Sequence, residues 1–351
     1  MIRSRSLVPF VAVASLAALA SACGGQDTTA DAEVSTTAAA VETTVVEQGP
    51  INPLLGTEAT DEAVLARPAM VVKIDNHPKA RPQMGLNQAD IVFEENVEKL
   101  TRFAAVFHSQ GSDPVGPIRS GRFQDINLVG SLNQPLFVWS GGNEKVTNAI
   151  RKSDLVDLSY TVANKDGGFA RDSERPAPHN LIAETTKLWT LAPDGSGAPQ
   201  KQFDYRTESD ANASTSEAVD GFRLSMDGVK VQWTWSTEAN EWLRVQDGTP
   251  HVDSNDEQIS VPNVIVLEVE YSNTYSPVSK TVGSGKAYVF TNGVVYVGSW
   301  ERTDRLSVYV IRDSAGAPIK LTPGQTFVQV ARAEKLAIIG SGVDPETIDY
   351  P

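Results

Sequence analysis

Short apolar runs bounded by turn-forming residues recur along the chain, and the first three predict strands. They cover residues 70–74, 91–93 and 103–107, and each is bounded by Pro, Gly, Asn or Asp. Runs of this length between such residues are typical of strands. The second and third, extended to 89–95 and 101–109, predict an antiparallel pair with one core face.

Polar side chains gather at the ends of these runs and form the site that the sequence predicts. The candidates for proton transfer are Asp75, Glu94 and His179. The candidates for ligand binding are Asn76, Arg81, Gln83, Arg102, Arg119, Ser120, Arg122 and Asn180. A simple turn explains Asp75 and Asn76 as well as a ligand does. A cross-strand ion pair with Glu94 or Glu95 likewise explains Arg102.

Apolar residues at helical spacing from 123 to 132 predict a helix, with Ser120 as a suitable N-cap. Arg119 and Arg122 then lie at its amino terminus, where the helix dipole disfavours cations. The two arginines therefore need an anion. It is either internal, from Asp75, Glu94 or Glu95, or external, such as a bound phosphate or carboxylate.

The rest of the first half alternates apolar runs and turns. Residues 136–139 predict a buried strand, 144–152 a helix and the polar stretch 160–175 a loop. In the following segment RPAPHNL, two prolines stiffen the approach to His179. This histidine is either a general base with Asn180 as its orienting amide, or a cap of the helix ETTKLWTLA.

The second half of the chain is rich in predicted strands. From about 192 to 217 the composition shifts to Pro, Gly, Ser, Thr and Asn, which predicts a domain boundary. Beyond it, VQWTWSTEANEWLRV and AYVFTNGVVYVGSW predict hairpins, the second with a type I′ turn at Asn292-Gly293. The tryptophans of the first hairpin form either core or a carbohydrate platform.

The predicted fold class is therefore α+β. Residues 51–205 form an N-terminal mixed α/β domain with a central sheet. Residues 206–351 form a smaller, mainly β C-terminal domain.

Residues 1–22 predict a signal peptide, because Arg3 and Arg5 precede an apolar core that is short for a membrane span. Small residues before Cys23 resemble a bacterial lipobox, in which this cysteine is lipidated; a plain secretory signal is the alternative. Cys23 is the only cysteine, which excludes an intramolecular disulfide and a cysteine nucleophile in the folded part. Residues 23–50 predict the lipidated cysteine and a flexible tether.

Composition narrows the classes of function. The chain of 351 residues has a formal net charge of -14 and a pI near 4.8, which argues against nucleic-acid binding. The glycine-rich nucleotide-binding motifs are absent. The four histidines lack the spacing of a zinc motif, so we predict no required metal and no cofactor.

Several long motifs carry a family resemblance. They are KIDNHPKARPQMGLNQADIVFEENVEKLTRFAAVFHSQ, VGPIRSGR, RPAPHNL, HVDS, NVIVLEVEY, GSGKAYVFTNGVVYVGSW and LTPGQTFVQV. In these, over residues 66–330, the chain resembles the YerB-like lipoproteins, a bacterial envelope family with a domain of unknown function. All the candidate site residues above fall within the N-terminal motifs. One departure is EKLT, where a glycine-containing turn is expected. The resemblance implies location and architecture, and supplies no established reaction.

Three functional interpretations remain, and whether the protein is an enzyme stays open. The first is a lipid-anchored protein on the extracytoplasmic face of the bacterial membrane that binds an anionic ligand or partner: a cell-wall glycan, a polyprenyl phosphate or an envelope protein. The second is a hydrolase of a phosphodiester or glycosidic bond that uses Glu94, Asp75 and His179. The third is a purely structural network. Because arginines lower the pKa of a nearby carboxylate and make it a poor acid, we favour binding.

Overall fold

The computed structural model describes residues 49–59, 61–207, 209–272 and 276–351. The predicted signal peptide, the predicted lipidation site Cys23 and nearly all of the predicted tether lie outside the described residues. The described part of the chain belongs to one compact unit, Glu47–Pro351. No helix within it is long and apolar enough to cross a membrane.

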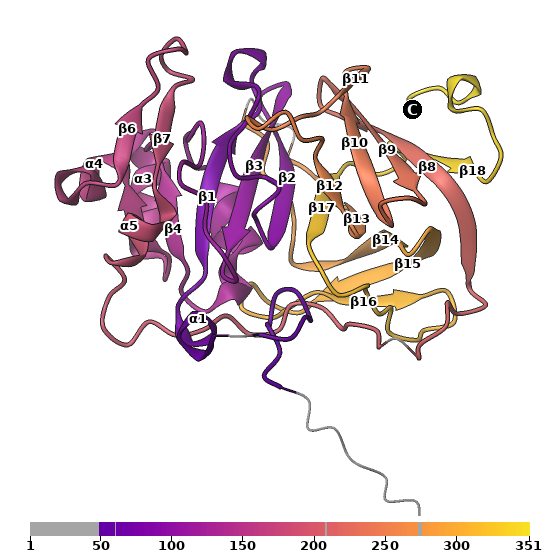
Figure 1. Ribbon diagram of the computed structural model, residues 1–351. Coiled ribbons are helices and arrows are strands. Elements are labelled where there is room, and N and C mark those ends of the chain that lie inside the picture. The colour runs from indigo at the N-terminus through magenta and orange to yellow at the C-terminus, as the bar shows by residue number, and fades with distance from the viewer. Residues whose placement is uncertain (1–48, 60, 208, 273–275) are drawn as a thin grey trace, which may run out of the picture. The chain divides into compact units, whose positions relative to one another are not determined.

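The N-terminal domain is built on five strands in the order β2-β3-β1-β4-β5 (Figure 1). β1 (Met70–Asp75) pairs antiparallel with β3 (Leu100–Phe107) and parallel with β4 (Leu136–Trp139). β2 (Ile91–Val97) pairs antiparallel with β3, and β5 (Val156–Ser159) pairs parallel with β4. The three predicted strands and the predicted antiparallel pair are confirmed.

The helices are short, and α3 (Glu144–Lys152) is the one whose predicted bounds are confirmed. It begins there because Asn143 caps it, accepting a hydrogen bond from the backbone N–H of Val146 at 3.0 Å. The other α-helices are α1 (Glu62–Ala66), α2 (Phe123–Leu128), α4 (Tyr160–Ala163) and α5 (Thr185–Trp189). Single 3-10 turns cover Pro78–Ala80, Gly130–Leu132, Asn164–Asp166 and Pro345–Thr347.

The prediction of a loop over residues 160–175 is wrong. This stretch holds α4 and β6 (Phe169–Arg171), which pairs with β7 (Leu181–Ala183). Tyr160 packs edge-to-face on Phe169, with ring centroids 5.7 Å apart. That aromatic contact orders a stretch whose glycines and charges dominate its local pattern.

The C-terminal domain consists of strands. They are β8 (Ser216–Met226), β9 (Val229–Ser236), β10 (Glu241–Gln246), β11 (Thr249–Pro250), β12 (Ser260–Val261), β13 (Asn263–Glu268), β14 (Gly283–Thr291), β15 (Val294–Arg302), β16 (Val310–Asp313), β17 (Thr326–Ala331) and β18 (Leu336–Gly340). Both predicted hairpins are confirmed, as β9–β10 and β14–β15. Asn292 and Gly293 have φ of 51° and 71°, as a type I′ turn requires. Trp233 and Trp242 are fully buried, which makes them core residues.

β17 joins the two domains. It pairs parallel with β2 of the N-terminal domain and, on its other side, parallel with β13. A hydrogen-bonded path of strands therefore runs from β5 to β11. The predicted domain boundary between residues 205 and 206 rests on composition alone and stays a prediction. Pairing between strands as far apart in sequence as β2 and β17 leaves no local pattern, so the sequence did not predict it.

Both faces of the central strands are buried, so the expectation of a single core face is wrong. Every residue of β1 and β2 is buried. Val71 and Phe93 face one core, which includes residues of α2 and α3. Val72 and Phe103 face the other, which includes Trp233 of the C-terminal domain. Consecutive residues of one strand thus meet different neighbours.

Candidate functional site

The polar residues predicted as one cluster lie on two faces of the central sheet. Glu94 and Glu95 are consecutive in β2, so they point in opposite directions. Asp75, Arg102 and Glu95 share one face, because they are direct cross-strand neighbours. Glu94 and Thr101 share the other, where the hydroxyl of Thr101 donates to Glu94 at 2.6 Å.

The face with Asp75 ends in a small open cleft of about 50 Å³, which we call the arginine cleft. It is lined by Asp75, His77, Val97, Glu98, Leu100, Thr101, Arg102, Arg119 and His179. The lining comes from β1, β2 and β3, from the turn between β2 and β3, and from three loops. A space of this size accepts a small group and not a sugar ring.

Three guanidinium groups converge around this cleft. Arg122 makes two hydrogen bonds to Glu98, at 3.0 and 2.6 Å. Arg102 donates to the backbone oxygen of Ser120 at 3.0 Å and lies 4.0 Å from Glu98. Burial and the charges of Arg122 and Arg119 lower the pKa of Arg102 to about 10, although Asp75 and Glu98 oppose them. Arg102 therefore stays charged at neutral pH, in a place with an excess of positive charge.

Arg119 is the arginine with donors to spare. Its Nε lies 3.2 Å from Asp75 Oδ2, and a quarter of the side chain is exposed. Its backbone N–H donates to the oxygen of Lys73 at 2.8 Å, which holds the residue beside β1. Among the described residues, its two terminal nitrogens have no hydrogen-bond partner. They are free to donate to a ligand in the cleft.

Two histidines complete the cleft, and their rings are stacked, with centroids 4.2 Å apart and planes 15° apart. His179 Nδ1 lies 2.7 Å from Asp75 Oδ2. His77 Nδ1 accepts a hydrogen bond from the backbone N–H of Lys79 at 3.1 Å. Burial and His179 lower the pKa of His77, and Asp75 opposes them. Within the described ranges, no group of three or more His, Cys, Asp or Glu side chains could hold a metal.

The helix after the arginines begins later than predicted, and Ser120 is not its N-cap. The N-cap is Arg122, whose backbone N–H donates to the side chain of Asp125 at 2.6 Å; its own side chain has no acceptor and cannot cap the helix. Ser120 lies in the preceding extended segment, with its hydroxyl 3.5 Å from that of Ser140. The guanidinium of Arg122 is paired with Glu98, and its backbone N–H is bonded to Asp125, so the anions at this helix terminus are internal. A helix of six residues adds little dipole.

Behind the cleft lies a buried charged trio. Lys73 Nζ is 2.6 Å from Glu95 and 2.7 Å from Asp125, and all three side chains are fully buried. Burial and the charge of Asp125 raise the pKa of Glu95, and Lys73 opposes them. The predicted ion pair of Arg102 with Glu94 or Glu95 is therefore wrong, because Lys73 holds Glu95 and Arg244 holds Glu94.

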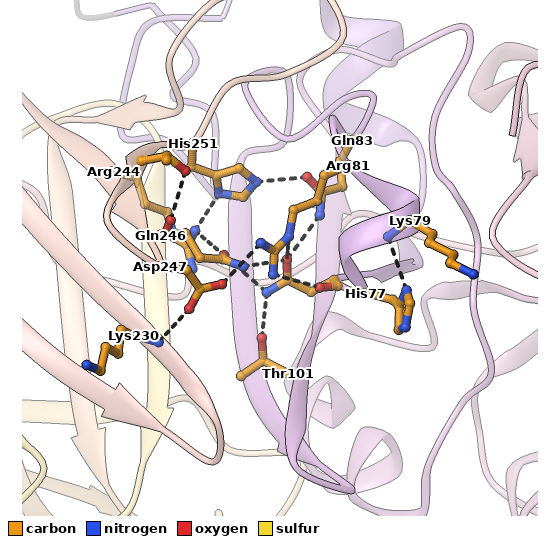
Figure 2. Close-up of polar contacts among 12 residues, drawn as sticks. His77, Lys79, Arg81, Gln83, Thr101, Lys230, Arg244, Gln246, Asp247 and His251 are labelled. Carbon is orange, nitrogen blue, oxygen red and sulfur yellow. Dashed lines mark hydrogen bonds and ion pairs between the residues drawn. The ribbon is translucent and has the colours of Figure 1, made fainter.

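The opposite face carries a second polar group, which we call the interdomain network (Figure 2). It comprises Asn76, Arg81, Gln83, Glu94, Thr101, Arg244, Gln246, Asp247 and His251. Arg244 pairs with Glu94 at 2.8 Å, and both side chains are fully buried. The network therefore joins the two domains through side chains as β17 joins them through backbone.

Asn76 is the centre of the interdomain network. Its amide nitrogen donates to Thr101 at 2.7 Å, and its amide oxygen accepts from Gln83 and Arg81, both at 3.2 Å. Gln246 of the C-terminal domain exchanges hydrogen bonds with the same amide. Asn76, Gln83 and Glu94 are buried, and Arg81 is paired with Asp247 at 3.1 Å. These predicted site residues connect domains and do not line the arginine cleft.

Asn180 lies next to the cleft histidine in sequence but does not orient it. Its amide oxygen accepts from Arg171 at 2.8 Å, and its amide nitrogen donates to the backbone oxygen of Asp172 at 3.2 Å. The group that orients His179 is the carboxylate of Asp75. His179 does not cap α5 either, because the N-cap of that helix is Glu184.

Among the cleft residues that can ionise, Glu98 and His77 are the two that the sequence did not predict. Glu98 belongs to the segment EKLT, and it comes from the two-residue turn that joins β2 to β3. Lys99 of this turn has a φ of 65°, a conformation that favours glycine. The glycine that the family resemblance leads us to expect in this turn would therefore stand where this chain has Lys99. A signal for His77 was its place directly after the strand end Asp75-Asn76.

Comparison with known proteins gives two family matches along the chain. Residues 54–198 match the N-terminal domain of a protein of unknown function (DUF3048), and residues 222–328 match the DUF3048 C-terminal domain. The chain is 27% identical over 305 residues to "Putative lipoprotein YerB" of Bacillus subtilis (strain 168), covering 83% of this chain and 88% of that one. It also resembles the crystal structure of YerB protein from Bacillus subtilis, with a TM-score of 0.72 and 23% identity, over 82% of this chain and 99% of that chain.

Proposed function

We propose, from the premise that this chain belongs to the DUF3048 family, that it is a lipoprotein which binds an anionic cell-envelope group in its arginine cleft. The anchor is a lipid on Cys23, and the folded part works on the extracytoplasmic face of the membrane. Two facts support the anchor: the lipobox-like residues before Cys23, and the lipoprotein name of the Bacillus relative.

One observation carries the binding proposal: the charges of the arginine cleft do not balance. Arg102 and Arg119 line the cleft, and Arg122 pairs with Glu98 from outside the lining, so three positive charges share two carboxylates, Asp75 and Glu98. Beneath the cleft, Lys73 is paired with both Glu95 and Asp125, and because burial raises the pKa of Glu95 to about 7, this trio adds less than one full negative charge near neutral pH. A bound anion supplies the missing charge and accepts from the free nitrogens of Arg119.

The size of the cleft narrows the ligand. About 50 Å³ accepts a phosphate or carboxylate group and leaves the rest of a larger molecule outside. A polyprenyl phosphate, an anionic cell-wall glycan and an acidic segment of an envelope protein all present such a group. Phosphate is the group that donors from several directions recognise best.

Calorimetric titration of residues 47–351 with inorganic phosphate and with glutarate tests the proposal. The wild type should bind at least one of them, and Arg119→Ala should bind about tenfold more weakly or worse, because it loses charged donors. Arg151→Ala is the matched control: Arg151 forms a similar ion pair, with Asp157 at 2.9 Å, and does not line the cleft. No binding by the wild type, or equal losses in both variants, would contradict the proposal.

The lipid anchor has its own test. Replacing Cys23 by alanine should remove label from radioactive palmitate and release the protein from the membrane fraction. Label or membrane retention that persists in the Cys23→Ala protein would count against anchoring through this residue.

A hydrolase remains a second candidate, favoured by the contact of 2.7 Å between Asp75 and His179. A carboxylate that orients an imidazole is a common general-base arrangement, and the arginines would stabilise developing negative charge. Glu94 has no part in this version, because it is fully buried and paired with Arg244. Release of nitrophenol from bis(p-nitrophenyl) phosphate, abolished in His179→Ala, would support it; no release by the wild type would dismiss it for phosphodiesters.

A further inference from the structure

The two cleft histidines are fixed in opposite tautomers. A backbone N–H always donates, so His77 Nδ1, which accepts from Lys79, carries no proton, and the proton of the neutral ring is on Nε2. A carboxylate accepts, so His179 Nδ1 donates to Asp75, and Nε2 of the neutral ring keeps its lone pair. Side by side, one ring presents a donor and the other an acceptor.

Apart from two carboxylates that are already bonded, the charged groups around these rings are donors. Both rings line the arginine cleft, and their Nδ1 atoms are already bonded, so the Nε2 atoms are the ones left to meet a ligand. Arg119 and Arg102 supply guanidinium N–H groups. The carboxylates Asp75 and Glu98 are engaged with His179, Arg119 and Arg122. The cleft thus offers several donors and one imidazole acceptor.

We propose that the arginine cleft selects oxyanions that carry their own hydroxyl group, namely hydrogen phosphate and the monoanions of phosphomonoesters, over sulfate and phosphodiesters. This rests on the proposed function, since it assumes that the cleft binds an anion. The P–OH group donates to His179 Nε2, while the other oxygens accept from His77 Nε2–H and the arginines. Sulfate and a phosphodiester have no such proton. When one of them is bound, the lone pair of His179 Nε2 faces a lone pair of the ligand oxygen, which weakens binding.

The groups that face His179 stabilise the tautomer on which this preference depends. Asp75 fixes its tautomer from one side, and His77 stacks against its ring. Arg119 is bound to the same carboxylate oxygen as His179, and Arg102 and Glu98 line the cleft beyond it. Exchange of Asp75 for asparagine removes the fixed tautomer, because an amide can donate to Nδ1 and move the ring proton to Nε2.

Inorganic phosphate and sulfate at pH 8 are the sharpest pair of probes, because both are tetrahedral dianions and only phosphate carries a proton. Titration calorimetry of residues 47–351 should give about tenfold or more tighter binding of phosphate. In Asp75→Asn the ratio of the two affinities should fall toward one. Asp172→Asn is the control, because Asp172 pairs with Arg175 outside the cleft lining and should leave the ratio unchanged.

The outcomes separate this inference from the proposed function. Equal binding of both ions, or tighter binding of sulfate, overturns the selectivity and leaves anion binding standing. A ratio that stays high in Asp75→Asn overturns the role of the histidine tautomer. Failure of phosphate, sulfate and glutarate alike to bind overturns anion binding itself. The wild-type comparison needs no variant to fold.

The hydroxyl-bearing phosphate could belong to a lipid or to a soluble molecule, and two further arms distinguish these sources. At pH 6, where about half of a phosphomonoester still carries its P–OH proton, glycerol 3-phosphate presents the group in solution, and phosphatidylcholine vesicles with phosphatidic acid present it on a membrane. Selective binding of either supports the shared chemistry and identifies its source. Equal binding to vesicles with phosphatidylglycerol, a phosphodiester, would overturn it.

Discussion

The arginine cleft and the interdomain network both contain residues of the central strands, and of the same kinds, yet only the cleft has the properties of a binding site. In the network, Glu94 and Arg244 are fully buried and paired with each other. In the cleft, Arg119 is partly exposed, and its terminal nitrogens have no partner among the described residues. Richness in polar side chains therefore says little about function. Arginine donors that are partly exposed and have no partner are stronger evidence for a binding site.

The largest expected effect breaks the network. Arg244→Ala leaves the carboxylate of Glu94 buried without its partner, which should cost about 3–5 kcal/mol of unfolding free energy. Urea unfolding followed by tryptophan fluorescence measures it. Arg151→Ala is the comparison: its pair with Asp157 is partly exposed and lies outside the network, so its loss should cost about 1 kcal/mol or less. Similar losses of unfolding free energy in the two variants would show that the buried pair of Arg244 and Glu94 stabilises the protein no more than a partly exposed pair does.

The buried trio behind the cleft should make stability depend on pH. Burial and Asp125 raise the pKa of Glu95 from 4.5 to about 7. A carboxyl group with a raised pKa binds its proton more tightly when folded, so its stabilising contribution is complete below pH 4.5 and is lost as the pH rises through 7. Glu95→Gln should remove this slope, which is about 1–3 kcal/mol between pH 5 and 8. Unfolding free energies of both proteins at several pH values measure it, and parallel curves would refute it.

Arg119→Ala sharpens the comparison from the side of the cleft. Because Arg119 is partly exposed, its removal should cost about 1 kcal/mol or less in stability, although it weakens phosphate binding about tenfold. The expectation for Arg244→Ala is the reverse: a large loss of stability, with phosphate binding kept at low temperature where the protein is still folded. If Arg244→Ala instead abolished phosphate binding and Arg119→Ala left it unchanged, the ligand would bind on the face of the interdomain network and not in the arginine cleft.

The smallest effect concerns the turn that brings Glu98 to the cleft. Lys99 has a φ of 65°, so Lys99→Gly should relieve strain and stabilise the protein by about 0.5–1 kcal/mol. Thermal unfolding detects such a change. Phosphate affinity should stay the same, since Lys99 does not line the cleft. Destabilisation would mean that the lysine side chain makes a contact that outweighs its backbone strain.

Particular residues show how far the sequence could lead. Apolar periodicity located β1, β2, β3, β4 and α3, because local patterns specify local structure. Strand alternation in IVFEENV already implied that Glu94 and Glu95 point to opposite faces, so the division of the polar residues was present in the sequence. The partners of Glu94 were not, since Arg244 lies 150 positions away and belongs to no motif with it.

The cleft shows the same limit at closer range. Asp75, His179 and three arginines stood out by residue type, and the structure brings them together. That Asp75, and not Asn180, orients His179 depends on a contact between residues 104 positions apart. The tautomer of His77 depends on one backbone hydrogen bond in a 3-10 turn, which no sequence pattern specifies.

The most direct test of the cleft is a crystal structure of residues 47–351 soaked in phosphate. We predict density for one phosphate within hydrogen-bond distance of Arg119 and Arg102, with an oxygen at Nε2 of His179, and an unchanged interdomain network. Phosphate bound elsewhere with an empty cleft, in crystals where these arginines are free of lattice contacts, would contradict the account.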